Sequence, residues 1–515
     1  MYKKSLILIV TIFFSCEGLF HENETEYLVI DSREEMIDML NGIYSNLVNV
    51  FDYEYFSVLA RSDDINVYTS YSYYSSDGTH SCSGGEGEID FQRITGEIYT
   101  NLYLAIISAN HLILQLSDTE ETDILGEVYF LRAYCYFKLA RIFGTPPLID
   151  DIDVDYLVEK PTYREVYEFI ETDMIKALEL LPGSYSGARI PGETPTKGTA
   201  KALLAEIYLA MAGFPVNDDA KYAEAARLAG EVIDQADQYH FALLEDFADL
   251  WKVANRHNTE TIFGLFFNEE NDETYNIIGN IGMYSYSADE LDIIGGYHPE
   301  FKFYNTFPDN YRRYTSFITG LYNHNSFVDT NDNYISALSF EPIDPLVDPC
   351  NFVHYVVSLK WIDQEAYHYE TPYWGRGSDL TLYLLRYAQT LLTYAEAKTR
   401  SGSLDASCYE AVNMIRRRAN KLDIHTPSEF DLPSDLTTEQ FLDSVVWERA
   451  WELCTEPEGR WFDIIRLNLK DELVNYRYSR DVHVSANPLH VNDDWYFFLV
   501  PKQDRWLNPN FSTIE

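Results

Sequence analysis

The hydrophobic pattern of this chain is helical, and its helical segments come in adjacent pairs. Between Asp31 and Val48, apolar residues recur three and four positions apart, which is the spacing of one helix face, with Asp31 or Ser32 as the N-cap. The same spacing predicts pairs at 31–48 with 91–116, 124–143 with 163–181, 196–211 with 220–236, and 380–400 with 406–420, followed by 437–453 and 461–469. The pattern therefore predicts a mainly α-helical scaffold.

Two features refine this scaffold. Alanines lie between larger residues in segments such as 205–208 and 394–397, and small side chains permit the close helix crossing of tetratricopeptide hairpins. The pairs do not recur at a fixed period of about 34 residues, so a plain solenoid is not expected. Two long irregular insertions interrupt them, at about 60–90 and 240–379. Because irregular segments of this length inside a compact domain usually carry function, we expect the ligand surface there.

The N-terminus resembles an export signal with a lipid attachment site. Lys3 and Lys4 precede an apolar run of nine residues, far fewer than the about 20 that span a bilayer. Ser15 and Cys16 then resemble the box at which signal peptidase cuts and the cysteine is lipidated. We therefore expect a signal peptide over 1–15, lipid on Cys16, an acidic tether over 16–30 and a single domain over 31–515. The alternatives are an ordinary secretory signal and an uncleaved anchor.

Charge, cysteines and motifs exclude several classes of protein. The chain holds 83 Asp and Glu against 38 Lys and Arg, and its formal net charge of -45 repels nucleic acid. The cysteines other than Cys16 are scattered and lack any C-x-x-C, so neither a disulfide framework nor a zinc ribbon is expected. The sequence has no H-E-x-x-H, G-x-S-x-G, phosphate-loop or dinucleotide motif. We therefore expect no catalytic residue, no cofactor and no metal site. The acidic loops at 151–155 and 329–333 imitate the start of a calcium loop without its Gly and Glu, and a calcium site stays open as an alternative to a solvated acidic loop.

Several blocks carry a more specific signal. They are LNGIY at 40–44, IYTNLY at 98–103, GEVYFLRA at 126–133 with GTPPL at 144–148, TKGTA at 196–200 with LLAEIYL at 203–209, YAEA at 394–397, ER at 448–449 and NPNF at 508–511. In this order they resemble the signature segments of the SusD/RagB family of outer-membrane nutrient-binding lipoproteins. One departure is EPEGRW at 456–461, which is one residue longer before Arg-Trp than is usual.

The resemblance implies both a fold and a role. It implies a lipid-anchored outer-membrane protein that faces outward and delivers an oligosaccharide, or less often a peptide, to a SusC-like TonB-dependent transporter without acting as an enzyme. The acidic residues after Cys16 resemble a surface-export signal of Bacteroidetes-type lipoproteins. Charged residues that recur at helix ends are expected to fix the scaffold, since paired and hydrogen-bonded charges set junction geometry. They are Arg132, Arg416, Glu448, Arg449, Glu452, Arg460 and Asp463.

The candidate ligand residues come from the insertions. The chain has 41 Tyr against 29 Phe and 8 Trp, and a tyrosine offers an apolar plate with a polar tip. Flat rings stack on sugar faces or on peptide side chains, while neighbouring Asp and Asn bind hydroxyls or amides. The candidates are Asp64, Asn66, Tyr68, Tyr71, Tyr73 and Tyr74 in the first insertion, and Tyr284, Tyr286, Tyr297 and Trp374 in the second.

Two rival functions stay open at this point. A surface glycoside hydrolase would need two carboxylates roughly 5 to 10 Å apart in a cleft, and with so many acidic residues the sequence always offers such a pair. A helical-repeat adaptor would bind protein through the paired helices and leave the insertions without a role in binding. The sequence does not reveal which ligand is bound.

Overall fold

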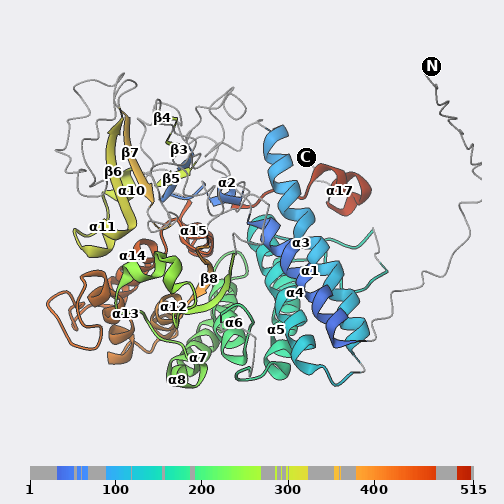
Figure 1. Ribbon diagram of the computed structural model, residues 1–515, viewed down its shortest axis with the longest axis horizontal. Helices are drawn as coiled ribbons and strands as arrows, with labels where there is room; N and C mark the ends of the chain where they lie inside the picture. The colour runs from blue at the N-terminus through green and yellow to red at the C-terminus, as the bar shows by residue number, and fades with distance from the viewer. Residues whose placement is uncertain are drawn as a thin grey trace, which may run out of the picture.

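The protein is built from helices, with one strand pair inside the scaffold and the other short strands on one side (Figure 1). The computed structural model describes residues 32–51, 55–59, 61–67, 88–117, 119–153, 157–185, 192–267, 285–286, 291–292, 297–299, 301–322, 353–358, 360, 379–470 and 496–511. The expected fold class, a mainly helical scaffold that carries long insertions, is confirmed.

The expected helix pairs form, and the two helices of each pair pack against each other. They are α1 (Arg33–Val50) with α3 (Glu88–Leu116), α4 (Thr122–Phe143) with α5 (Tyr163–Leu180), α6 (Lys197–Ala212) with α7 (Lys221–Asp234), and α12 (Tyr387–Arg400) with α13 (Ala406–Ala419). Neighbouring pairs also touch, since α3 contacts α4, α5 contacts α6, and α7 contacts α12. The helices α14 (Thr438–Glu452) and α15 (Arg460–Arg466) follow, and α14 packs on α12. The scaffold is therefore a continuous stack of hairpins (Figure 1).

Hydroxyl side chains begin several of these helices. Ser32, Thr162 and Thr437 each accept a hydrogen bond from the backbone N–H three residues later, and a Glu or Gln side chain there accepts from the backbone N–H of the cap. Such a cap stabilises a helix by about 1 kcal/mol. The expected cap Thr196 binds in the same way at the start of α6. These helix starts are therefore encoded locally.

A close approach expected at Gly198 is confirmed. A Cβ at this position would lie 2.5 Å from Cγ of Tyr239, which ends the short helix α8 (Ala236–Tyr239). Only a residue without a side chain fits there. The glycine of this signature block therefore serves packing.

The first part of the helix expected over 380–400 is a strand. Residues Leu382–Arg386 form β8, which pairs antiparallel with β2 (Thr261–Leu265), and α12 begins only at Tyr387. All residues of both strands are buried. Because a segment buried on every side is apolar throughout, its spacing does not distinguish a strand from a helix. The second insertion therefore begins with an element of the core.

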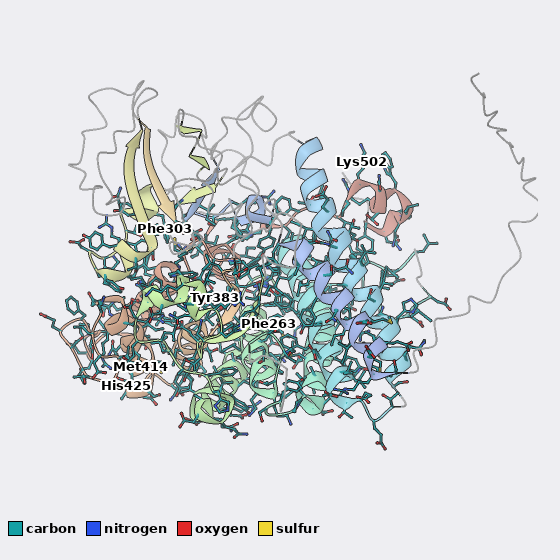
Figure 2. The ribbon with its side chains drawn as sticks, in the orientation of Figure 1. Phe263, Phe303, Tyr383, Met414, His425 and Lys502 are labelled. Atoms are coloured by element: carbon teal, nitrogen blue, oxygen red, sulfur yellow. The ribbon has the colours of Figure 1, made fainter. Side chains whose placement is uncertain are left out.

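The β2–β8 pair lies deep in the molecule, as the positions of Phe263 and Tyr383 show (Figure 2). The Phe263 ring is fully buried, and its centroid lies 5.0 Å from that of Phe130 and 5.5 Å from that of Tyr134. The Tyr383 hydroxyl donates to the Leu250 carbonyl at 2.7 Å. These contacts tie the insertion to α4.

The remaining strands also pair in twos. They are β1 (Ile65–Val67) with β5 (Tyr297–Pro299), β3 (Ser285–Tyr286) with β4 (Leu291–Asp292), and β6 (Phe317–Tyr322) with β7 (Val353–Ser358). Short helices complete the described part: α2 (Tyr55–Leu59), α10 (Phe301–Tyr304), α11 (Tyr311–Ser316), α17 (Lys502–Leu507), η2 (Phe247–Trp251), η3 (Val253–Asn255) and η7 (Pro509–Phe511). Across the described residues, no helix is both long and apolar enough to cross a membrane.

The charged residues expected to fix the scaffold do form buried pairs. Arg132 on α4 donates to both carboxylate oxygens of Asp173 on α5, at 2.6 and 2.8 Å. Arg449 on α14 donates from Nε to Asp463 on α15 at 3.1 Å. Arg416, Glu448, Glu452 and Arg460 are ion-paired as well, and all of this set except Arg416 are buried. The prediction of a structural role is confirmed.

Candidate functional site

Apart from β2, the described strands of both insertions lie on the same side of the scaffold, beside α14 and α15 (Figure 1). Strand β1 of the first insertion pairs antiparallel with β5 of the second, so that Asn66 lies opposite His298 and Val67 opposite Tyr297. Two candidate ligand residues, Asn66 and Tyr297, thus come from distant parts of the sequence to one strand pair. This pair is the centre of the candidate site.

The other candidate ligand residues do not belong to the β1–β5 pair. Tyr286 belongs to β3 and lies opposite Leu291 of β4. Outside the described residues lie Tyr68, Tyr71, Tyr73, Tyr74, Tyr284, Trp374 and the expected lipidation site Cys16. Their roles stay predictions.

Asp64 lies inside the protein, with 2% of its surface exposed. Its carboxylate accepts a hydrogen bond from the Thr455 backbone N–H at 2.9 Å and another from the Ser62 hydroxyl. Burial raises the pKa of Asp64 from 3.8 to about 6, although these hydrogen bonds and Arg460 act in the opposite direction. In this structure the Asp64 carboxylate therefore forms hydrogen bonds within the protein, and its contact with a ligand stays a prediction.

An aromatic cluster fixes the second insertion on α14. Phe303 on α10, Phe307 and Phe317 are buried, and the ring of Phe307 lies 5.6 Å from that of Phe303 and 4.9 Å from that of Phe317, edge to face. The cluster packs on Ala450 and Cys454, and Figure 2 places Phe303 at the base of the β6–β7 hairpin. Strand β7 also contacts β5. The β1–β5 pair is therefore joined to an anchored hairpin.

Residues 455–460, which run from the turn after α14 to the first residue of α15, form a junction that holds the first insertion. Arg460 donates to both carboxylate oxygens of Asp63, each at 2.9 Å, and both side chains are buried. The Thr455 N–H binds Asp64, as described above. The Pro457 carbonyl accepts from the Tyr55 hydroxyl at 3.1 Å. These contacts fix the residues that lead directly into β1.

The same junction holds the second insertion. The hydroxyl oxygens of Thr455 and Ser358, the last residue of β7, lie 3.1 Å apart within hydrogen-bonding distance. Lys360 is buried and donates from Nζ to the Glu456 carboxylate at 2.7 Å and to the Glu452 carbonyl at 2.9 Å. Both insertions are therefore bound to one short turn.

The junction is in turn fixed to the scaffold. Arg386 at the end of β8 donates to both oxygens of Glu456, each at 2.8 Å. Glu458 accepts from Lys138 and from Tyr134, both on α4 and both at 2.7 Å, and it pairs with Arg141 at 2.6 Å. In the unusual segment at 456–461, nearly every polar side chain thus forms an ion pair or a hydrogen bond.

Burial and ion pairing compete in this region. Burial would raise the pKa of Glu452, but Arg418, Arg386 and Arg312 outweigh it and hold the carboxyl pKa well below its usual range. For Lys138 burial dominates over the attraction of Glu458 and lowers the pKa to about 7. The buried Glu452 carboxylate is therefore ionised and paired, which suits it to a structural role.

The sequence analysis did not identify the residues of the second insertion that take part in these buried ion pairs. Glu260, Arg312 and Lys360 come from the second insertion, and they pair with Arg418, Glu452 and Glu456 of the scaffold. A charged residue in an irregular segment has no periodic signal, so only an alignment of related chains would have singled these out. In the part of the chain that the structure describes, no three His, Cys, Asp or Glu side chains are grouped to hold a metal ion.

Comparisons with known proteins bear on the whole chain. Residues 21–209 match a family model described as starch-binding associating with outer membrane, and residues 252–511 match the model of the SusD family. The chain belongs to the SusD family. A SusD-like protein of Formosa agariphila is 25% identical over 516 residues, covering 92% of each chain. The family resemblance expected from the sequence blocks is confirmed.

Solved structures share the fold of this SusD family member. A SusD homolog from Bacteroides thetaiotaomicron superposes with a TM-score of 0.76 at 22% identity, covering 96% of this chain and 98% of that one. A laminarin-binding SusD-like protein superposes with a TM-score of 0.63 at 20% identity, covering 93% of this chain and 98% of its own. At these identities the likeness shows a common fold.

Proposed function

We propose that this protein is a non-catalytic, cell-surface lipoprotein that binds an oligosaccharide and delivers it to a TonB-dependent transporter of the outer membrane. Membership of the SusD family supports this role, and the laminarin-binding relative supports a glycan as the ligand class. The observation that carries the proposal is the β1–β5 pair, which joins the two insertions and brings Asn66 and Tyr297 onto adjacent strands. The strand pair thus supports a ligand surface to which both insertions contribute, with Asn66 opposite His298 and Tyr297 opposite Val67.

The expected affinity suits capture followed by release. A ring that covers about 50 to 80 Å² of a sugar face contributes roughly 1 to 2 kcal/mol at about 25 cal/mol per Å². Three such rings, after the cost of ordering, support a dissociation constant on the order of millimolar to micromolar. A ligand held this weakly can be passed on to a transporter.

The anchoring belongs to the same proposal. Cleavage before Cys16 and lipidation of that cysteine would attach the mature chain to the outer membrane, with residues 16–30 as an acidic tether and 31–515 as the folded domain. A single lipid anchor holds weakly, so contact with the transporter would supply a second attachment. Mass spectrometry of the mature protein tests the lipid, and co-purification with the transporter tests the partner.

A glycan array followed by calorimetry tests ligand binding. We expect Asn66→Ala and Tyr297→Ala to weaken binding of the best glycan at least tenfold. The matched control is Trp506→Ala, because this residue is 73% exposed on α17, which lies apart from β1 and β5 (Figure 1). Binding that survives deletion of 66–80 would favour the adaptor, and turnover abolished by changing one carboxylate would favour the hydrolase. Binding of peptides alone would contradict the glycan assignment.

A further inference from the structure

The contacts around the two insertions form a closed circuit, that is, a series of contacts that starts at the junction, passes through both insertions and returns to the junction. From the junction at 455–460 the chain of contacts passes through Asp63 to β1, from β1 to its partner β5, and from β5 to β7. It returns from Ser358 of β7 to Thr455 of the junction. Each insertion is therefore held twice, once by the other insertion and once by the same short turn.

The contacts on the junction side restrict direction as well as distance. A guanidinium that donates to both oxygens of one carboxylate fixes the plane of the pair, which a single point contact does not. Asp63 lies two residues before Ile65, the first residue of β1 and itself buried. The orientation of the Arg460–Asp63 pair therefore constrains the orientation of β1.

The second insertion is restricted in the same manner. Glu456 binds Lys360 of the insertion and Arg386 of the scaffold at once, so that one carboxylate links the two. Lys360 lies two residues after the end of β7. The position of β7, and through it of β5, is thus set by a residue of the junction.

We propose that Arg460 and Glu456 are positioning residues for the glycan surface, which act through β1 and β7 and set the geometry of the two insertions before ligand arrives. The proposal rests on the proposed function of glycan binding. Both residues are buried, so they act without touching the glycan. A surface held in its binding geometry spares the ligand the entropy of ordering it, and affinity rises accordingly.

The test compares two buried Arg–Asp pairs of the same geometry. Asp63→Asn breaks the junction pair, whereas Asp173→Asn breaks the pair with Arg132 between α4 and α5, which lies outside the circuit. Laminarin oligosaccharide serves as the probe in calorimetry. We expect at least tenfold weaker binding for Asp63→Asn and a change within twofold for Asp173→Asn, at a comparable loss of melting temperature. Equal effects of the two variants on binding would overturn the proposal.

A second measurement needs no glycan. Hydrogen exchange followed by mass spectrometry should show faster exchange in β1, β5 and β7 for Asp63→Asn, and for the milder variant Ser358→Ala, with α5 unchanged. Asp173→Asn should show the reverse. If exchange in the three strands is unaltered, positioning by the junction is refuted. Wild-type protein that binds no glycan would contradict the proposed function alone, and the exchange data would still decide on the junction.

Discussion

Replacing Asp64 by Asn should stabilise the protein at neutral pH. The carboxylate is buried, and Asn keeps an oxygen that can accept from the Thr455 N–H while its amide group can donate to the Ser62 hydroxyl. The substitution therefore removes a buried charge and keeps both hydrogen bonds. It imitates the protonated form of Asp64.

The magnitude follows from the pKa. Burial raises the pKa of Asp64 from 3.8 to about 6, which at about 1.36 kcal/mol per pKa unit corresponds to about 3 kcal/mol. Since the folded state binds the proton more tightly than the unfolded chain, this contribution is fully present below about pH 3.8 and is lost as the pH rises through about 6. At pH 7.5 the charged Asp64 thus costs up to about 3 kcal/mol, which Asp64→Asn recovers.

Urea denaturation of wild type and variant at pH 4, 5, 6 and 7.5 measures the effect. The free energy of unfolding of Asp64→Asn should exceed that of wild type by about 1 to 3 kcal/mol at pH 7.5 and should equal it near pH 4. The control Asp63→Asn should lower the free energy of unfolding at pH 7.5, because it leaves the buried Arg460 unpaired. A difference that does not change with pH, or a variant less stable at pH 7.5, would refute the reasoning.

Further substitutions at Gly198, Phe263 and Thr437, with Gly42→Ala as a control, test the scaffold by thermal and urea denaturation. Gly198→Ala should lower the free energy of unfolding by about 1 to 3 kcal/mol, because its Cβ would collide with the Tyr239 ring. Gly42→Ala has no atom near its Cβ and should raise the free energy of unfolding by about 0.5 to 1 kcal/mol. Equal effects of the two substitutions would contradict the packing argument. Phe263→Ala should cost about 3 to 5 kcal/mol, and a cost below 1 would show that β2 is not part of the core. Thr437→Ala should cost about 1 kcal/mol, and restoration by Ser but not by Val would confirm the cap.

The helix pairs could be predicted from the sequence because each helix is marked by features of its own local sequence. Polar caps such as Thr162 and Thr196 mark the starts, and the three-and-four spacing of buried residues continues along each helix. For α6 with α7 and α12 with α13, a short connection also makes the consecutive helices neighbours. Except for α12, which begins at Tyr387 and not at 380, element bounds in these pairs differ by a few residues at most, as for α5, expected over 163–181 and found over Tyr163–Leu180.

The segment 380–386 could not be assigned in this way. Its apolar residues continue directly into those of α12, and what makes it a strand is the partner β2, which lies more than a hundred residues earlier in the sequence. A hydrogen-bonding partner at that distance leaves no mark on the local pattern. The pairing of β1 with β5 could not be predicted for the same reason, because the two strands are far apart in the sequence.

The candidate site was predicted at the level of segments only. Composition pointed to the insertions, and the structure places Asn66 and Tyr297 on paired strands, one position out of register with each other, but no periodicity relates the two residues. Asp64 illustrates the limit, because an acidic residue beside Asn66 in a polar segment gives no sign of being buried. Burial is a property of the assembled fold, and the Thr455 amide that binds Asp64 comes from near the other end of the chain.

The ion pairs beneath the insertions are balanced, although the chain as a whole is strongly acidic. Four buried carboxylates, Glu260, Glu448, Glu452 and Glu456, meet four buried cations, Arg312, Lys360, Arg386 and Arg418, and the partly exposed Arg416 also pairs with Glu448. The acidic excess therefore lies outside this cluster. Such a cluster is a weak source of stability compared with apolar packing, since each ion loses its hydration. It does restrict geometry, because an apolar surface tolerates sliding whereas a bidentate pair accepts one orientation. An irregular insertion that must present a defined surface gains more from that restriction than from additional apolar burial.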